Sequence, residues 1–159
     1  MPAKKLKEFL DQQHIKYITI RHSRAYTAQE TAEMAHISGK ELAKTVMVKV
    51  NGKMAMAVLP ADEQVDLELL KSNAHARTAS LASEAEFTDL FPQCETGAMP
   101  PFGNLYNQDV YVEESLAADE FIAFNAGSHA ELIQLRYSDY AKLVEPKVIR
   151  MSTRYISQF

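Results

Sequence analysis

One stretch of this sequence combines residues that restrict the backbone with residues that free it. Residues 97–103 read Gly-Ala-Met-Pro-Pro-Phe-Gly, in which adjacent prolines fix consecutive φ angles and remove backbone donors. A glycine at each end supplies φ values that other residues avoid. We expect a rigid loop whose backbone carbonyls can hold an ammonium or hydroxyl group of a small ligand. A plain connector between a helix and a strand is the alternative, since glycine and proline clusters commonly mark loops.

Lys44 and His129 are the polar side chains whose surroundings single them out. Lys44 lies within residues 42–46, Leu-Ala-Lys-Thr-Val, at the start of an apolar strand pattern. Its ammonium group could face a phosphate or carbonyl of a ligand, or extend to solvent from a sheet edge. His129 follows the Ala-Gly-Ser turn at 126–128, where its ring could contact a base or a ribose, or pack as a structural side chain. The residues alone leave both pairs of alternatives open.

The motifs of covalent and metal-dependent hydrolysis do not occur in this sequence. It has no G-x-S-x-G, H-E-x-x-H, P-loop or dinucleotide-binding glycine pattern. The histidines are scattered and no pair has metal-ligand spacing, so we expect no metal and no cofactor. A single cysteine, Cys94, excludes an internal disulfide and leaves a thiol nucleophile as an alternative to a small packing residue. We therefore expect chemistry that depends on positioning, backbone groups and one cation.

Length and composition bound the kind of protein. A chain of 159 residues fits one domain over residues 1–159, and 47% hydrophobic and 24% charged residues indicate a globular protein. No apolar run reaches the roughly 20 residues of a membrane helix, and the N-terminus does not have the pattern of a signal peptide. We expect a cytoplasmic protein that binds neither membrane nor DNA. Its net charge of −4 argues against a protein that covers nucleic acids without sequence specificity. It is compatible with a local basic site that binds one end of an RNA.

Helical and strand patterns alternate along the chain. Apolar spacing and capping signals predict helices at residues 6–14, 27–39, 66–71, 83–91 and 138–143, with Thr27, Ser83 and Ser138 as caps. Strand patterns lie at residues 15–20, 43–50, 53–59, 110–112, 120–125 and 130–135. Asn51-Gly52 predicts a hairpin at the centre of the sheet. Because several strands are joined by short turns, we expect an α+β fold: a single domain with a central mixed, largely antiparallel sheet flanked by helices.

Several of these segments occur in the same order as in one known family. They are 26–30 (Tyr-Thr-Ala-Gln-Glu), 43–45 (Ala-Lys-Thr), 58–61 (Val-Leu-Pro-Ala), the loop 97–103 and 124–129 (Phe-Asn-Ala-Gly-Ser-His). Together they resemble the YbaK-like domain, which also occurs as the editing insertion of bacterial prolyl-tRNA synthetases. The resemblance spans residues 15–143. It implies a free-standing aminoacyl-tRNA deacylase whose partners are the 3′ acceptor end of an aminoacyl-tRNA and, as a further suggestion, an aminoacyl-tRNA synthetase.

The resemblance also implies a reaction and a set of site residues. A trans-editing hydrolase of this kind removes a small amino acid from mischarged tRNA, by water attack on the ester with help from a ribose hydroxyl of the terminal adenosine. Lys44 and Gly97 are the candidate catalytic residues, and residues 97–101 correspond to the family's Gly-x-x-x-Pro loop. The candidate substrate-binding residues are Thr27, Lys44, Gly97, Ala98, Met99, Pro100, Pro101, Phe102, Gly127, Ser128 and His129.

A non-catalytic member of the same fold, which binds tRNA or an amino-acid-like ligand, is the alternative function. The lysine at position 44 and the intact loop favour the enzyme, because a scaffold needs neither. A substrate-assisted reaction fits the missing nucleophile, since an aminoacyl ester is already activated and orientation with carbonyl polarisation can suffice.

Overall fold

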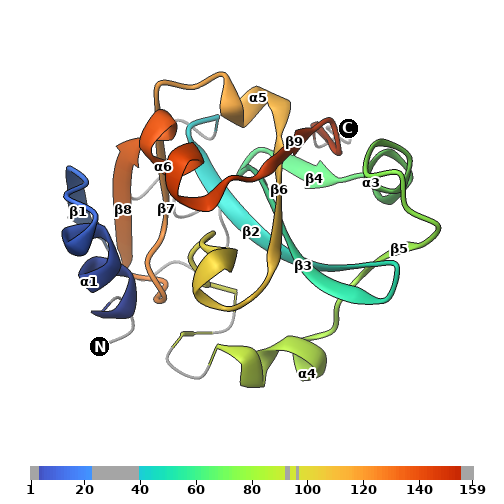
Figure 1. The fold of residues 1–159 in the computed structure, drawn as a ribbon, viewed down its shortest axis with the longest axis horizontal. Coiled ribbons are helices and arrows are strands. Elements are labelled where there is room, and N and C mark those ends of the chain that lie inside the picture. The colour runs from blue at the N-terminus through green and yellow to red at the C-terminus, as the bar shows by residue number, and fades with distance from the viewer. Residues whose placement is uncertain (1–3, 23–39, 92–93, 96, 155–159) are drawn as a thin grey trace, which may run out of the picture.

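The fold is organised around a hairpin at the centre of a mixed sheet. The computed structural model describes residues 4–22, 40–91, 94–95 and 97–154. Strands β2 (Leu42–Val50) and β3 (Lys53–Pro60) pair antiparallel, and their turn residues Asn51 and Gly52 have φ values of 53° and 78°. Positive φ at both positions is what a type I′ turn requires. The strand order β1-β8-β7-β2-β3-β6-β9 places this hairpin centrally, as predicted (Figure 1).

The remaining strands make the sheet mixed, which confirms the predicted class. They are β1 (Tyr17–Arg21), β5 (Ala79–Leu81), β6 (Asp109–Glu113), β7 (Phe121–Asn125), β8 (Glu131–Arg136) and β9 (Lys147–Ile149). The pairs β2–β7, β3–β6 and β6–β9 are parallel, whereas β1–β8, β2–β5 and β7–β8 are antiparallel. A small second sheet joins β4 (Glu63–Val65) to β10 (Ser152–Arg154).

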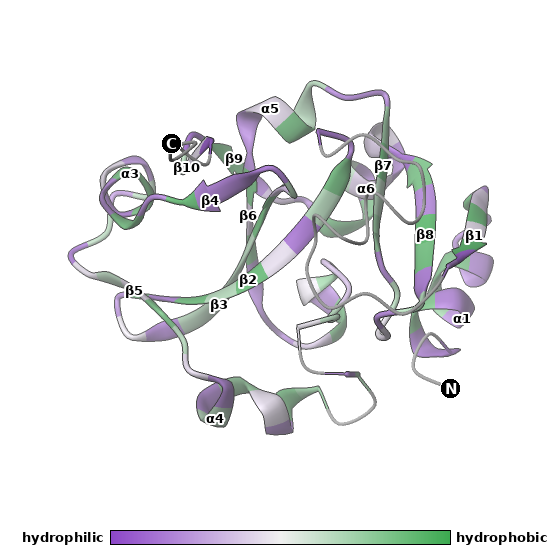
Figure 2. Ribbon diagram, turned by 180° about the vertical axis from the view of Figure 1, so that it is seen from behind, coloured by the Kyte–Doolittle hydropathy of each residue, from purple (hydrophilic) through white to green (hydrophobic). Residues whose placement is uncertain are grey.

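Alternate residues of the strands divide the core between the two faces of the sheet. One face buries side chains such as Met56, Phe124 and Ile133 against α1 (Lys4–Gln12) and α6 (Tyr137–Val144). The other face packs Val48, Ala57 and Tyr111 against Leu70 of α3 (Leu67–Asn73). Apolar residues recur along β2, β3, β7 and β8 (Figure 2). The period of two along each strand therefore buries apolar side chains on both sides of the sheet.

The helix predicted at residues 83–91 is shorter than expected. Ser83 and Glu86 do form the predicted capping box, but α4 (Glu84–Phe87) gives way at once to a 3-10 helix, η1 (Thr88–Leu90). The Thr88 hydroxyl donates to the Glu84 carbonyl at 2.6 Å. A threonine side chain that bonds the backbone of the preceding turn competes with regular helix, which explains the change.

The prediction that Ser138 caps a helix is wrong. Helix α6 begins one residue earlier, with Arg136 at the cap position and without a side-chain cap bond. The Tyr137 N–H instead donates to the Glu120 carbonyl at 2.9 Å, so a neighbouring strand end satisfies the first helical donor. A tertiary contact replaces the local cap.

The elements that the sequence patterns did not reveal are short. They are β4, β5, β9, β10, α5 (Glu114–Ala117) and η2 (Gly103–Leu105). Segments of three or four residues are too short to show a period. The predicted helix at 27–39, with its cap Thr27, lies outside the described residues. Of the helices in the described ranges, none has the length and apolar character needed to span a membrane.

Candidate functional site

The central strand β2 opens to solvent in its middle. Lys44, Thr45 and Val46 are partly exposed, whereas Ala43 and Met47 on either side are only 2% and 3% exposed. On one edge of β2, strand β7 pairs at residues 42–43 and strand β5 pairs at residues 48–50. Among the strands that the structure describes, none pairs with this edge between them. We call this break in the sheet, at residues 44–46, the β2 gap.

The backbone of Thr45 faces the β2 gap. The carbonyl of Glu41 accepts the N–H of Ala123, and the carbonyl of Met47 accepts the N–H of Ala82, both on this edge. Backbone groups of a strand alternate between its two edges with a period of two, so Thr45 presents its N–H and C=O to the same edge. No pattern in the sequence singles out this residue, because a threonine within a strand carries no local signal that the strand's edge is unpaired there.

Lys44 lies at the point where β7 ends. Leu42 and Ala43 pair in parallel with Ala123 and Phe124, and the continued register places Lys44 beside Asn125. The Asn125 Oδ1 atom is buried and makes no hydrogen bond with any other described residue. An unsatisfied buried acceptor beside a lysine marks this end of β7 as a place where a polar ligand group can bind.

The glycine turn, residues 126–129, follows β7 directly and is hydrogen-bonded to residues 95–98. The Glu95 N–H donates to the Gly127 carbonyl at 2.8 Å, and the Gly127 N–H donates to the Ala98 carbonyl at 2.9 Å. The Glu95 Oε1 accepts the His129 N–H at 2.6 Å across a separation of 34 residues. The structure thus brings together the two segments that held most of the predicted site residues.

Gly97 lies where these two segments meet. The Ala98 N–H donates to the Glu95 carbonyl at 3.0 Å, which closes a turn with Gly97 in its third position and with φ +84°. This conformation favours glycine. A β-carbon at Gly97 would lie 3.6 Å from Cε1 of His129, so the histidine ring lies next to the glycine. Gly97 is exposed whereas His129 is 8% exposed, so the backbone of Gly97 faces solvent in front of a nearly covered ring.

The second glycine of the loop serves a different purpose from the one expected. Gly97 has the positive φ that the sequence predicts, but Gly103 is not among the residues with positive φ. A β-carbon at Gly103 would lie 2.5 Å from the Gln108 carbonyl oxygen and 2.6 Å from Cγ2 of Val110. Gly103 is therefore required by close packing, not by backbone conformation.

The rest of the loop is part of the core. Ala98, Met99 and Phe102 are at most 3% exposed, and Pro100 and Pro101 are buried. We expected these residues to offer free carbonyls to a ligand, but several are already used. The Ala98 carbonyl accepts the Gly127 N–H of the glycine turn. The Pro100 carbonyl accepts the Phe102 N–H at 2.8 Å, and the Pro101 carbonyl accepts the buried Tyr140 hydroxyl at 2.7 Å. Burial and these hydrogen bonds therefore hold residues 98–102, which follow Gly97, in place within the core.

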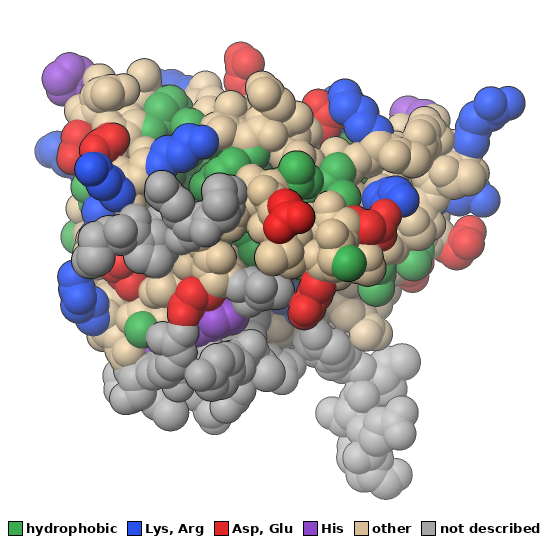
Figure 3. Space-filling model, turned by 90° about the horizontal axis from the view of Figure 1, so that it is seen from below, with side chains coloured by type: hydrophobic (Ala, Val, Ile, Leu, Met, Phe, Trp, Pro, Cys, Tyr) green, Lys and Arg blue, Asp and Glu red, His purple; other side chains and the backbone are tan. Residues whose placement is uncertain are grey.

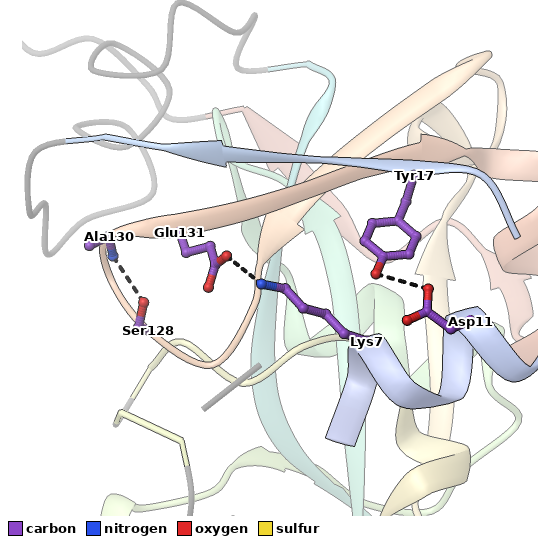
Figure 4. Close-up of polar contacts among 6 residues, drawn as sticks. All are labelled: Lys7, Asp11, Tyr17, Ser128, Ala130 and Glu131. Atoms are coloured by element: carbon purple, nitrogen blue, oxygen red, sulfur yellow. Dashed lines mark hydrogen bonds and ion pairs between the residues drawn. The ribbon is translucent and has the colours of Figure 1, made fainter. Parts of the chain in front are cut away.

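Ser128 supports the glycine turn from within. Its Oγ accepts the Ala130 N–H at 3.3 Å, and Lys7 of α1 bonds Glu131 just beyond the turn at 2.8 Å (Figure 4). The Ala126 N–H donates to the Glu131 carbonyl at 3.1 Å and closes the β7–β8 hairpin. Of the predicted binding residues, only Thr27 lies outside the described part of the chain.

Cys94 lacks the surroundings of a nucleophile. Burial raises the pKa of the Cys94 thiol, and its Sγ lies 3.8 Å from the Tyr106 hydroxyl. A reactive cysteine needs a lowered pKa, since the thiolate is the nucleophile. The raised pKa of the Cys94 thiol therefore weighs against a thiol hydrolase.

In the described ranges, no group of three or more His, Cys, Asp or Glu side chains could hold a metal ion.

The sequence matches a known family over most of its length. The profile of the aminoacyl-tRNA editing domain covers residues 22–143. The chain belongs to this family. An editing-domain relative, the multifunctional Ser/Thr-tRNA deacylase ProXp-y of Escherichia coli (strain K12), is 31% identical over 146 residues, which are 88% of this chain and 86% of that protein. The protein of the same name from Escherichia coli O157:H7 gives the same values.

Solved structures share the fold of this editing domain. The crystal structure of the hypothetical protein APE2540 superposes with a TM-score of 0.83 at 20% identity, over 94% of this chain and all of that one. A protein assigned as a trans-editing enzyme for prolyl-tRNA synthetase gives a TM-score of 0.80 at 17% identity, over 96% and 97% of the two chains. The resemblance identified from sequence motifs is confirmed, and the protein is an aminoacyl-tRNA deacylase, a hydrolase of translation.

Proposed function

We propose that this deacylase acts in trans on mischarged aminoacyl-tRNA and removes small amino acids. The observation that carries the proposal is the meeting of three features at the end of β7. Lys44 and the Thr45 backbone border the β2 gap, and the glycine turn that follows β7 is bonded to the loop that holds Gly97. A cation, a strand edge that none of the described strands pairs with, and an exposed glycine backbone are what a reaction without a protein nucleophile needs.

The chemistry is hydrolysis of the ester that joins the amino acid to the terminal ribose. Water adds to the ester carbonyl carbon, and the bond from that carbon to the ribose oxygen then breaks. The ribose oxygen takes a proton, so the products are a free amino acid and an uncharged tRNA. The neighbouring ribose hydroxyl assists the water. The Lys44 ammonium group and the Thr45 N–H at the β2 gap stabilise the negative charge that develops on the carbonyl oxygen.

The preference for small amino acids follows from the rigid packing of residues 98–102 next to Gly97. The loop residues behind Gly97 are packed in the core and held by the Tyr140 hydroxyl and the glycine turn, so they cannot retreat from a large side chain. Overfilling a packed site costs about 1–3 kcal/mol. An apolar pocket rejects an added hydroxyl poorly, so alanyl and seryl groups are accepted together. The Ser/Thr-tRNA deacylase among the relatives acts on residues of this size by name.

The partner is the 3′ acceptor end of an aminoacyl-tRNA in the cytoplasm. The face of the molecule seen in Figure 3 carries both acidic and basic side chains, with small hydrophobic patches between them. Binding along a long duplex needs many contacts between basic side chains and phosphates. A surface that carries both charges is better suited to recognising one end of an RNA. An aminoacyl-tRNA synthetase that works with the protein is part of the same proposal.

A panel of mischarged tRNAs tests the proposal. The measurement is kcat/KM for alanyl-, seryl-, threonyl-, leucyl- and phenylalanyl-tRNA. We expect the alanyl and seryl esters to be hydrolysed roughly 10- to 100-fold faster than the leucyl and phenylalanyl esters, which corresponds to an overfilling cost of about 1–3 kcal/mol. Faster hydrolysis of the large esters would contradict the size argument. Binding without turnover on every ester would instead support the non-catalytic alternative.

A further inference from the structure

We propose that Glu95 is a positioning residue that holds the glycine turn against the Gly97 loop. The inference rests on the proposed function, because its purpose is to keep two parts of that site in place. Glu95 follows Cys94 in a stretch that no sequence motif singles out. It contacts the site through its backbone and its side chain at once.

Three polar groups of Glu95 bond to parts of the candidate site. Its N–H donates to the Gly127 carbonyl at 2.8 Å, and its own carbonyl accepts the Ala98 N–H at 3.0 Å. Its Oε1 accepts the His129 N–H at 2.6 Å in a partly buried position. The backbone bonds fix the start of the Gly97 turn, and the side-chain bond fixes the far end of the glycine turn. Glu95 therefore spans both segments.

The bond from the carboxylate sets where His129 lies. The Gly127 bonds hold one end of the glycine turn, and the hairpin bond from Ala126 to Glu131 holds its base. His129, at the other end, carries the ring that lies behind Gly97, with Cε1 3.6 Å from where a β-carbon would be. Without the carboxylate, the His129 N–H loses a charge-assisted acceptor, and the ring and the Gly97 backbone can shift together.

Such a shift affects the reaction more than the fold. Displacing a reacting group by about 1 Å can cost on the order of 100-fold in rate. Glu95 is only partly buried and is not among the residues of the hydrophobic core. Affinity for tRNA depends largely on phosphate contacts, which this change leaves intact. The expected signature is a loss in kcat with little change in KM.

The test compares Glu95→Ala with Glu95→Gln. We expect Glu95→Ala to lower kcat on seryl-tRNA by about 10- to 100-fold, with KM within about 3-fold of the wild type. Glu95→Gln keeps an oxygen acceptor for the His129 N–H and should recover kcat to within about 3-fold. If Glu95 acted instead through its charge, as a base, the glutamine variant would lose as much as the alanine variant, and the proposal would be wrong.

Glu131→Ala is the matched control. Glu131 lies two residues after His129, but its carboxylate bonds Lys7 of α1 at 2.8 Å and does not bond the turn amides. We expect Glu131→Ala to retain wild-type kcat. Loss of kcat in Glu131→Ala equal to that in Glu95→Ala would show that any carboxylate removed near the turn has the same effect, and would overturn the proposal.

Amide hydrogen exchange separates this proposal from the proposed function. We expect the His129 amide to exchange at least about 10-fold faster in Glu95→Ala than in the wild type and in Glu95→Gln, because its acceptor is removed. This readout does not depend on catalysis. If no mischarged tRNA is hydrolysed but His129 exchange responds, the proposed function fails while the bonding role of Glu95 stands. Unchanged exchange in Glu95→Ala overturns the positioning role whatever the activity.

Discussion

Lys44 and Lys49 show how position along one strand separates a candidate functional lysine from a structural one. Both lie on β2 and both are partly exposed. Lys49 bonds Glu86 of α4 at 2.6 Å, which explains its presence without reference to a substrate. Lys44 lies at the β2 gap beside the end of β7. The residue type is the same, but only Lys44 borders the candidate site.

We predict that Lys44→Ala loses most deacylation activity and keeps its fold. A cation that stabilises the developing oxyanion contributes on the order of 100-fold or more to kcat. A partly exposed lysine changes the free energy of unfolding by about 0.5 kcal/mol or less. Single-turnover rates and urea unfolding measure the two effects, with Lys49→Ala as the control on the same strand. Wild-type turnover in Lys44→Ala would remove Lys44 from the site.

Gly97 and Gly52 form a second matched pair. Their φ values are +84° and +78°, but a β-carbon at Gly52 would have no neighbour within 4 Å, whereas one at Gly97 would meet His129. We predict that alanine at either position lowers the free energy of unfolding by about 1–2 kcal/mol, because both force a side chain into the left-handed region. Only Gly97→Ala should reduce the deacylation rate. Equal activity in the two variants would contradict a role for Gly97 in the site.

Cys94 is expected to be dispensable. Burial raises the pKa of its thiol, so little thiolate forms at neutral pH. We predict that Cys94→Ala hydrolyses seryl-tRNA within about 3-fold of the wild-type rate, and that a chelator has equally little effect on the wild type. A collapse of the rate in Cys94→Ala would favour a thiol mechanism, and a collapse with chelator would favour a metal.

At the scale of elements, α4 depends on an ion pair as well as on its capping box. The hydrogen bond from Lys49, and then the bond from the Ser83 backbone, lower the pKa of Glu86 from 4.5 to about 2. A carboxyl group whose pKa is lower in the folded state stabilises the fold above its unfolded pKa. That stabilisation is lost as pH falls from about 4.5 toward 2.

We therefore predict a pH-dependent difference between the wild type and Glu86→Gln. Above about pH 5, the wild type should have the larger free energy of unfolding, and the difference should shrink as pH falls toward about 2.5. Urea unfolding at several pH values measures it, with Glu84→Gln on the same helix as the control. Because the group is exposed to solvent, high salt should reduce the difference. A difference that is constant with pH would show that the ion pair does not contribute.

At the scale of the whole molecule, the residues after α6 are tied to the sheet by a buried carboxylate. Glu113, at the end of β6, is 4% exposed. Its Oε1 accepts the N–H groups of Met151 and Ser152 at 2.7 Å and 2.8 Å, and the Ser152 hydroxyl at 2.8 Å. These bonds hold β10, which pairs with β4 in the small second sheet, close to the end of β6 (Figure 2).

We predict that Glu113→Ala reduces stability without changing the chemistry. Removing the acceptor leaves buried N–H donors unsatisfied, at a cost of about 1–3 kcal/mol each. The free energy of unfolding should fall by at least that amount, while kcat at a temperature well below the transition stays within about 3-fold of the wild type. A proportionate fall in kcat would show that the C-terminal strands and the site are coupled.

Local signals in the sequence determined the parts of this protein that depend on neighbouring residues. The Asn51-Gly52 turn, the Ser83 capping box and the positive φ of Gly97 are properties of a few consecutive residues, and all are confirmed. The order of the motifs was enough to identify the editing-domain family. The short turns between strands predicted the mixed sheet, although α4 was predicted too long and the cap of α6 was misplaced.

Only the tertiary structure decided how the site is assembled. The β2 gap exists because β7 and β5 pair with different parts of the same strand edge, and no pattern within β2 records where its neighbours stop. The carbonyls of residues 98–102 looked free in sequence but are used by partners such as Gly127 and Tyr140. Glu95 meets His129 across 34 residues. Contacts between distant segments depend on strand order and packing, whereas turns and caps depend on adjacent residues, and that difference separates what the sequence could predict from what it could not.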